Sequence, residues 1–207
     1  MAVTAGPRCV HQPSALSRRW ASRAGHPCLN LVLCIMGILS YYFSVRPERL
    51  GRALQVCESD DDLWKYVNEW EQQAKGGPEG DYYSGSKQWD GLWWMVDPAR
   101  QRGEGAPSNA LGKAVVGANR LFPNPGTSHL IYWSWRLVSQ EEVGEAAAAF
   151  SSSSVRDRFD PVAALTADVY FQFFQLRPED YEHYFDHLTR FYNLAASRGR
   201  AVLVVLD

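Results

Sequence analysis

The longest apolar run of the chain lies near its N-terminus, over residues 29–45. This stretch reads LNLVLCIMGILSYYFSV, and no Asp, Glu, Lys or Arg occurs between Ala24 and Val45. A transmembrane helix needs about 20 mostly apolar residues, with about 17 at the short end. A tyrosine pair near the end of the run and three arginines after it resemble the flanks of a membrane span. The pattern therefore predicts a transmembrane helix and its extension over 24–56.

The predicted span is defined by its apolar and small residues. They are Leu29, Leu31, Leu33, Ile35, Gly37, Ile38, Leu39, Tyr41, Tyr42 and Phe43. Asn30 and two serines load the run with polar groups, so we expect the helix to pack against partners. Two alternatives stay open: the run is a buried amphipathic core helix of a soluble protein, or it is a secretory signal, which the poor cleavage site after it disfavours.

Residues 57–207 are predicted to form an extramembrane domain. Ser59 and Asp62 resemble a helix cap and open an amphipathic helix that Gly76 closes, and Ser139 with Glu142 opens another helix. The aromatic and β-branched stretch 129–138 and residues 201–206 are strand candidates that would lie side by side.

The C-terminal part, 129–207, is predicted to be mainly helical. Residues 162–176 are apolar on nearly every side after the Asp160-Pro161 start, and a second helix follows Pro178. We expect the two to form an antiparallel hairpin. The inner stripe of the second helix is Tyr181, Tyr184, Phe185, Leu188, Phe191, Tyr192 and Ala195. The predicted fold class is mainly α with irregular loops: one N-terminal transmembrane helix and a small extramembrane α(+β) domain that ends in this hairpin.

Residues 76–128 hold most of the glycines and prolines, which predicts irregular structure. The segment is nevertheless rich in aromatic side chains, which are the residues that anchor protein interfaces. We therefore expect it to dock on a partner, and an irregular core within this chain is the alternative. The predicted docking residues are Tyr82, Tyr83, Trp89, Trp93 and Trp94.

The charge of the chain is divided between its two ends. The 207 residues carry 21 Lys and Arg against 23 Asp and Glu, a formal net charge of −2. Residues 1–23 hold four arginines and no acid, which is typical of an organellar targeting region, whereas residues 46–207 sum to −6 (17 basic, 23 acidic). No uniform cationic surface is available, so we expect no nucleic-acid partner.

Candidate chemistry is sparse in the sequence. Phosphate-loop and nucleophile-elbow motifs are missing, and the four cysteines show no metal-binding spacing, so we expect no cofactor. His183 and His187 lie one helical turn apart with Glu179 one turn before them, which makes these three the weak candidates for a metal site. Solvated or partner-facing histidines are the favoured interpretation.

Together these patterns favour a non-catalytic, single-pass accessory subunit of a mitochondrial inner-membrane complex, either respiratory chain or ATP synthase. Such a subunit would act in assembly and stability through contacts with other subunits and with membrane lipid. The alternative is an enzyme anchored in another organellar or secretory-pathway membrane, with a metal bound by His183, His187 and Glu179.

Overall fold

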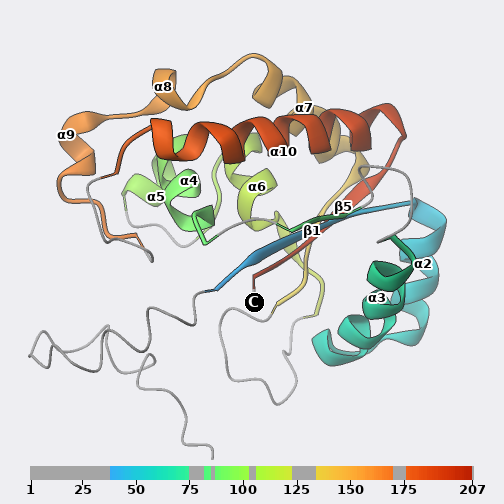
Figure 1. Ribbon diagram of the computed structural model, residues 1–207. Helices are drawn as coiled ribbons and strands as arrows, with labels where there is room; N and C mark the ends of the chain where they lie inside the picture. The colour runs from blue at the N-terminus through green and yellow to red at the C-terminus, as the bar shows by residue number, and fades with distance from the viewer. Residues whose placement is uncertain are drawn as a thin grey trace, which may run out of the picture. The chain divides into compact units, whose positions relative to one another are not determined.

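A five-stranded antiparallel sheet organises the computed structural model, with the strand order β2-β1-β5-β4-β3 (Figure 1). The structure describes residues 38–74, 82–84, 87–102, 106–122, 134–169 and 176–206, and in 68–74 it describes the backbone alone. The strands are β1 Ser40–Val45, β2 Tyr82–Ser84, β3 Asn119–Arg120, β4 Arg136–Val138 and β5 Ala201–Leu206.

The pairing of β1 with β5 forms the centre of this sheet. Six residue pairs run from Ser40 opposite Leu206 to Val45 opposite Ala201. All of β1 except the partly exposed Tyr41 is buried, and so is β5 up to Val205. A strand covered on both faces reads as a continuous apolar run rather than as an alternating one, which is how these two segments read.

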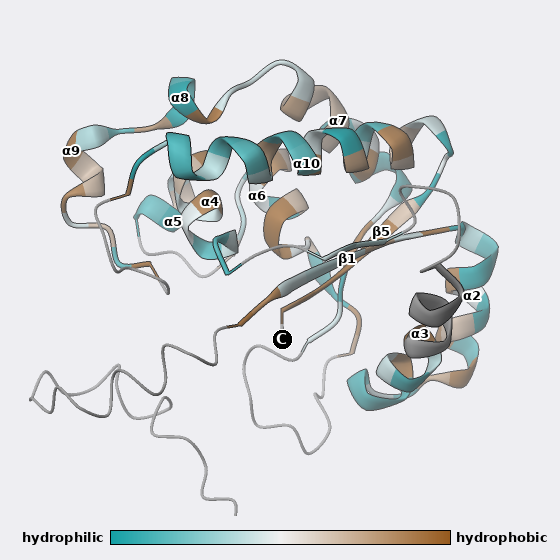
Figure 2. Cartoon of the chain, viewed as in Figure 1, coloured by the Kyte–Doolittle hydropathy of each residue, from teal (hydrophilic) through white to brown (hydrophobic). Residues whose placement is uncertain are grey.

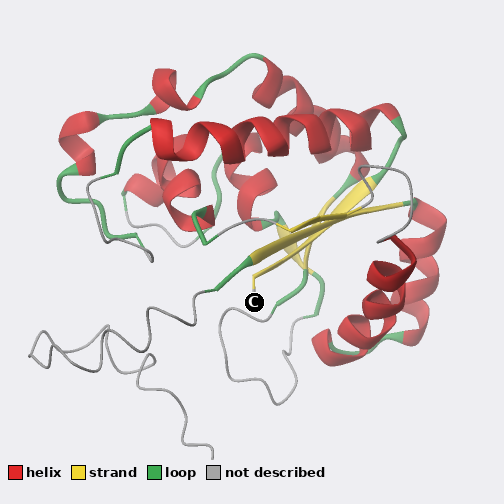
Figure 3. Cartoon of the chain, viewed as in Figure 1, coloured by secondary structure: helices red, strands yellow, loops and turns green. Residues whose placement is uncertain are grey.

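Helices cover both faces of the sheet (Figures 1 and 3). Tyr42 and Val204 face a core built with α4 Trp89–Val96, α6 Ala110–Val116, α7 Gln140–Ser151 and α10 Glu179–Ser197. Phe43 and Leu203 face a smaller core built with α2 Pro47–Val56 and α3 Asp60–Ala74. Three short helices complete the described elements: α5 Pro98–Gln101, α8 Val155–Arg158 and α9 Pro161–Ala164.

The long helix α10 confirms the predicted stripe, because all seven of its inner residues are buried. Figure 2 shows hydrophilic and hydrophobic positions alternating along it. Gly199 ends the helix at φ +62°, with its own N–H bonded to the Ala196 carbonyl and the Arg200 N–H bonded to the Ala195 carbonyl. This pair of bonds is a Schellman motif, which favours glycine at the left-handed position.

The predicted helix starts are confirmed. The Ser59 hydroxyl accepts the Asp62 N–H at 3.2 Å, and α3 begins at the next residue, Asp60. Ser139 and Glu142 form a complete capping box at the start of α7. The predicted strand at 201–206 is also confirmed, and it pairs with β4 as expected.

The predicted fold class is wrong in its membrane part. Tyr41, Tyr42 and Phe43 lie in β1, and none of the helices in the described ranges has the length and apolarity to cross a bilayer. Ile38 and Leu39 are described but lie outside the helices, whereas Leu29, Leu31, Leu33, Ile35 and Gly37 lie outside the described residues, as does the basic tail 1–23.

The predicted C-terminal hairpin is wrong as well. After Pro161 the chain makes the four-residue helix α9, and the amides of residues 165–167 bond three residues back, in tight turns. Val162 and Leu165 are exposed, whereas Ala164, Ala167 and Val169 are buried, so the segment is not buried on every side as predicted. Helix α10 instead packs on α7, where Phe150 contacts Phe185 with ring centroids 5.0 Å apart.

A buried carboxylate fixes the turn between α4 and α6. Asp97 is fully buried, and it accepts hydrogen bonds from the Ala99 N–H at 3.0 Å, from both the N–H and the hydroxyl of Ser108, and from the Trp93 indole. Gly112 packs directly against this carboxylate, and a Cβ on Gly112 would overlap it. The carboxylate has no room to move because its donors hold it on several sides.

We therefore expect Gly112→Ala to lower the free energy of unfolding by about 1–3 kcal/mol, because it overpacks a fixed site. The matched control is Gly144→Ala in α7, where a Cβ meets nothing within 4 Å. That change should raise the free energy of unfolding by up to about 1 kcal/mol, since alanine is the better helix former. Urea unfolding midpoints measure both, and a Gly112→Ala protein as stable as the wild type would contradict the packing described.

Candidate functional site

The edge strand β2 places two tyrosines on opposite faces of the sheet. Tyr83 lies on the α10 side, where its ring stacks at 5.9 Å from Tyr42 and 6.1 Å from Tyr184. Tyr82 lies on the other side, with its ring 5.0 Å from Phe43 and 6.4 Å from Tyr41. Both tyrosines are partly exposed. This is the expected result of alternating side-chain directions along a strand.

Two histidines of α10 join Tyr83 at this edge. His187 stacks nearly parallel on the Tyr83 ring, with an interplanar angle of 6° and ring centroids 5.6 Å apart. His183, one turn earlier, lies with its ring centroid 4.3 Å from that of His187. His183 is exposed and His187 is partly exposed. We call Tyr82, Tyr83, His183 and His187 the aromatic edge.

The electrostatic setting keeps His187 uncharged at neutral pH. Burial lowers the pKa of His187 below its ordinary value of 6.5, and the nearby His183 and Arg190 lower it further, against an opposing effect of Asp186. His187 therefore presents a neutral ring to Tyr83 rather than an imidazolium at pH 7.

A chain of buried hydroxyls lies behind the aromatic edge and joins the sheet to α10. The Tyr42 hydroxyl donates to the Val115 carbonyl at 2.7 Å and lies 2.7 Å from the Tyr184 hydroxyl, which in turn lies 2.8 Å from Ser40 Oγ. Because Tyr42 donates its single hydroxyl proton to the Val115 carbonyl, Tyr184 must donate to Tyr42, and Ser40 must donate to Tyr184. A neighbouring tyrosine, Tyr192, donates to the Ala114 carbonyl at 2.7 Å.

These hydroxyls are held in the protonated form. Burial raises the pKa values of Tyr42 and Tyr184 above the ordinary value of 10, and it raises the pKa of Tyr83 to about 12. Groups whose pKa is raised by folding stabilise the fold fully below pH 10, and this stabilisation is lost as the pH rises through the folded-state values. At neutral pH the chain of hydroxyls is a structural connection and offers no phenolate base.

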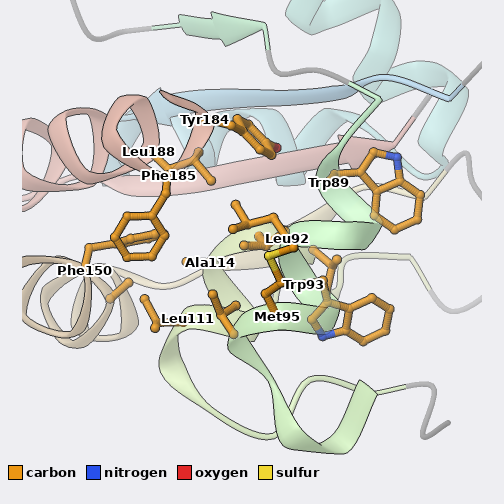
Figure 4. Close-up of a cluster of buried hydrophobic side chains, with 14 of the residues drawn as sticks. Trp89, Leu92, Trp93, Met95, Leu111, Ala114, Phe150, Tyr184, Phe185 and Leu188 are labelled. Carbon is orange, nitrogen blue, oxygen red and sulfur yellow. The ribbon is translucent and has the colours of Figure 1, made fainter. Parts of the chain in front are cut away.

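The three tryptophans predicted to dock are placed in this chain's own core. Trp89, Trp93 and Trp94 lie on α4 and are 4%, 8% and 2% exposed, and Figure 4 shows the first two extending from that helix beside the buried cluster. The Trp89 indole donates to the Ile38 carbonyl and the Trp93 indole to Asp97, each at 3.2 Å. The structure therefore follows the alternative of an internal core for these three, and a docking role for Tyr82 and Tyr83 stays a prediction.

The weak metal candidates are only partly brought together. His183 and His187 are adjacent, but the Glu179 carboxylate forms an ion pair with Arg156 at 3.1 Å. Within the described ranges, no group of three or more His, Cys, Asp or Glu side chains is arranged to hold a metal ion. The approach of Tyr83 to the histidines was not predicted, because roughly 100 residues separate β2 from α10 and no local pattern links them.

The hydroxyl chain generates a test with a matched control. We expect Tyr184→Phe to lower the free energy of unfolding by about 1–2 kcal/mol, because it removes the buried hydroxyl that donates to Tyr42 and accepts from Ser40. Tyr181→Phe removes a hydroxyl that bonds to no described residue and should change stability by less than about 0.5 kcal/mol. Chemical denaturation of both variants measures the difference, and equal effects would show that the chain of hydroxyls is not a stabilising connection.

Comparison with solved structures finds a similar architecture in another protein. The crystal structure of YfbM from Escherichia coli, titled a protein of unknown function, is similar with a TM-score of 0.52 and 15% sequence identity, covering 82% of this chain and 99% of that one. At this identity the likeness concerns the fold alone. None of the curated proteins compared matches the chain.

The predicted localisation is corrected by these findings. The last six residues of the predicted span, Ser40–Val45, form β1 of the sheet, and the similar structure shares that fold over most of both chains, so the assignment to the mitochondrial inner membrane as a single-pass protein is wrong. Neither the similar structure nor the matching protein-family model points to a respiratory-chain or ATP-synthase subunit. A protein-family model matches residues 36–205, and the chain therefore belongs to the family described as Domain of unknown function (DUF1877).

Proposed function

We propose that this chain is a non-catalytic protein-binding domain that contacts its partner through the aromatic edge. The observation that carries the proposal is the stack of Tyr83 on His187 with His183 beside it, partly exposed at the side of the sheet. The proposal keeps the protein contacts predicted from the sequence. It leaves out the membrane, and with it the lipid contact.

The packing that holds Tyr83 in place supports binding. Tyr83 rests on the fully buried Tyr42 and on Tyr184, and both of these rings are held at their hydroxyls. A side chain that is already ordered before binding loses little conformational entropy when a partner covers it. Flat aromatic rings with two rotatable bonds are the groups that contribute most binding energy in protein interfaces.

The buried acids of the described ranges support a non-catalytic role, because each serves the fold. Asp90 forms two hydrogen bonds with Arg100 at 2.9 and 3.0 Å, and Asp97 fixes the turn after α4. Asp60 accepts the backbone N–H of Trp135 at 2.9 Å and so ties α3 to the sheet, although its second carboxylate oxygen has no hydrogen-bond partner. A general acid or base needs a substrate-facing position, and these groups face their own chain.

The chemistry of the aromatic edge indicates the partner it fits. The neutral rings of Tyr83 and His187 offer π-faces, and Asp186 on the same helix is an exposed acid. A partner protein that presents an arginine or a flat aromatic side chain would stack on these rings, and an arginine would also be attracted by the carboxylate. That the protein binds no nucleic acid stays a prediction.

Site-specific photocrosslinking tests the proposal. A benzoylphenylalanine at position 183 should form one discrete protein adduct in cells, whereas the same residue at the exposed position 193 of α10 should not. Adding Tyr83→Leu should abolish the adduct at 183, because it removes the ring on which the partner packs. Thermal unfolding of each protein provides the control for folding.

Adducts of equal yield at 183 and 193, or an adduct at 183 that persists in the folded Tyr83→Leu protein, would overturn the proposal. Either result would mean that contact is general to the surface of α10 and does not depend on the aromatic edge.

A further inference from the structure

Two histidines stand one turn apart on α10 with their ring nitrogens unused by the fold. His183 and His187 are at i and i+4, on a helix of 19 residues that packs firmly on the rest of the domain. Neither imidazole donates or accepts a hydrogen bond within the described part of the chain, although the two rings contact each other and Tyr83. Because no group in the described part of the chain occupies their ring nitrogens, this pair is available for a ligand.

The spacing of the two rings fits joint coordination of one metal ion. Two imidazoles bound to one ion at metal–nitrogen distances of about 2.0–2.1 Å have ring centroids about 4.5 Å apart at a 90° bond angle and about 5 Å apart in a tetrahedron. The observed separation is 4.3 Å, slightly shorter, with the rings edge to face at an interplanar angle of 72°, so joint coordination requires one ring to turn. Because His183 is exposed, its side chain can rotate to direct a nitrogen towards the same point as His187 without disturbing the core.

The surroundings of the pair define which ligands the protein supplies. Glu179, one turn earlier, is engaged with Arg156, and its neighbour Glu182 bonds the same arginine at 2.5 Å. These two acids are therefore engaged in ion pairs with Arg156 of α8. The protein contributes two nitrogens, and water fills the remaining positions. Sites of this kind suit late transition metals and not Mg²⁺ or Ca²⁺, which need oxygen ligands.

We propose that His183 and His187 form a two-histidine site for a divalent late transition-metal ion of the Ni²⁺, Cu²⁺ and Zn²⁺ class. The helix geometry supports this site, because positions i and i+4 bring both side chains to one face. The Tyr83 ring stacked on His187 limits the orientations that this imidazole can adopt. The site requires no partner protein, so it stands or falls independently of the protein-binding role.

Calorimetric titration of the full chain with Ni²⁺ at pH 7.5 tests the site. We expect one binding event in the wild type that weakens at least about 10-fold in His183→Ala and likewise in His187→Ala, because a single imidazole loses the advantage of chelation. The double variant measures the background from the other histidines and the cysteines of the chain. Asp186→Asn, which keeps both imidazoles, should bind as the wild type does, and Mg²⁺ should not bind at this site.

A second readout is thermal stability, which does not depend on heats of mixing. Ni²⁺ that bridges two turns of the folded helix should raise the unfolding temperature of the wild type and of Asp186→Asn but not of either histidine variant. Wild-type affinity in both single histidine variants, or a rise in unfolding temperature that survives the double change, would overturn the proposal. Either outcome would assign the metal to the other histidines or the cysteines.

Discussion

The antiparallel pairing of β1 with β5 is the interaction on which the rest of the structure depends. These two strands are covered on both faces, so each contributes side chains to two cores at once. Tyr42 and Val204 belong to the core under α4, α6, α7 and α10, whereas Phe43 and Leu203 belong to the core under α2 and α3. A shift of one residue in this register would exchange the two sets of side chains between the cores.

The buried hydroxyls transmit this arrangement to the aromatic edge. The Tyr42 side chain extends from the centre of the sheet. Its hydroxyl bonds α6 through the Val115 carbonyl and α10 through Tyr184. Tyr83 then stacks on these two tyrosines and on His187. The position of the partly exposed rings is therefore set by groups that are themselves fully buried. A surface built this way is ordered in the absence of any partner, which is the property that the proposed binding role needs.

Short-range patterns in the sequence predicted those helix ends and buried helix faces that depend only on neighbouring residues. The Ser139–Glu142 cap and the buried stripe of α10 needed only neighbouring residues, and both were predicted. The run at 29–45 misled because a strand buried on both faces has the same apolar composition as part of a membrane helix. Which of the two forms depends on β5, which lies about 160 residues further along the chain.

Non-local packing also explains what could not be predicted of the candidate site. All eight residues of α4 are buried, so the helix has no polar face, and its tryptophans resembled interface anchors in a loop. The histidine pair was visible at i and i+4, but its junction with Tyr83 arises only when β2 joins the edge of the sheet. Among the residues that the structure describes, the tryptophans of α4 lie inside the domain, and Tyr82 and Tyr83 of β2 are partly exposed.

Hydrogen–deuterium exchange of the full chain tests the central pairing most directly. Amides of 40–45 and 201–206 should exchange at closely similar, very slow rates, because both strands become exposed only when the whole domain unfolds. The segment containing β2, at the edge of the sheet, should exchange faster than either. Rapid exchange in 40–45 beside slow exchange in 201–206 would contradict the account, since it would show that β1 is not held in the centre of the sheet.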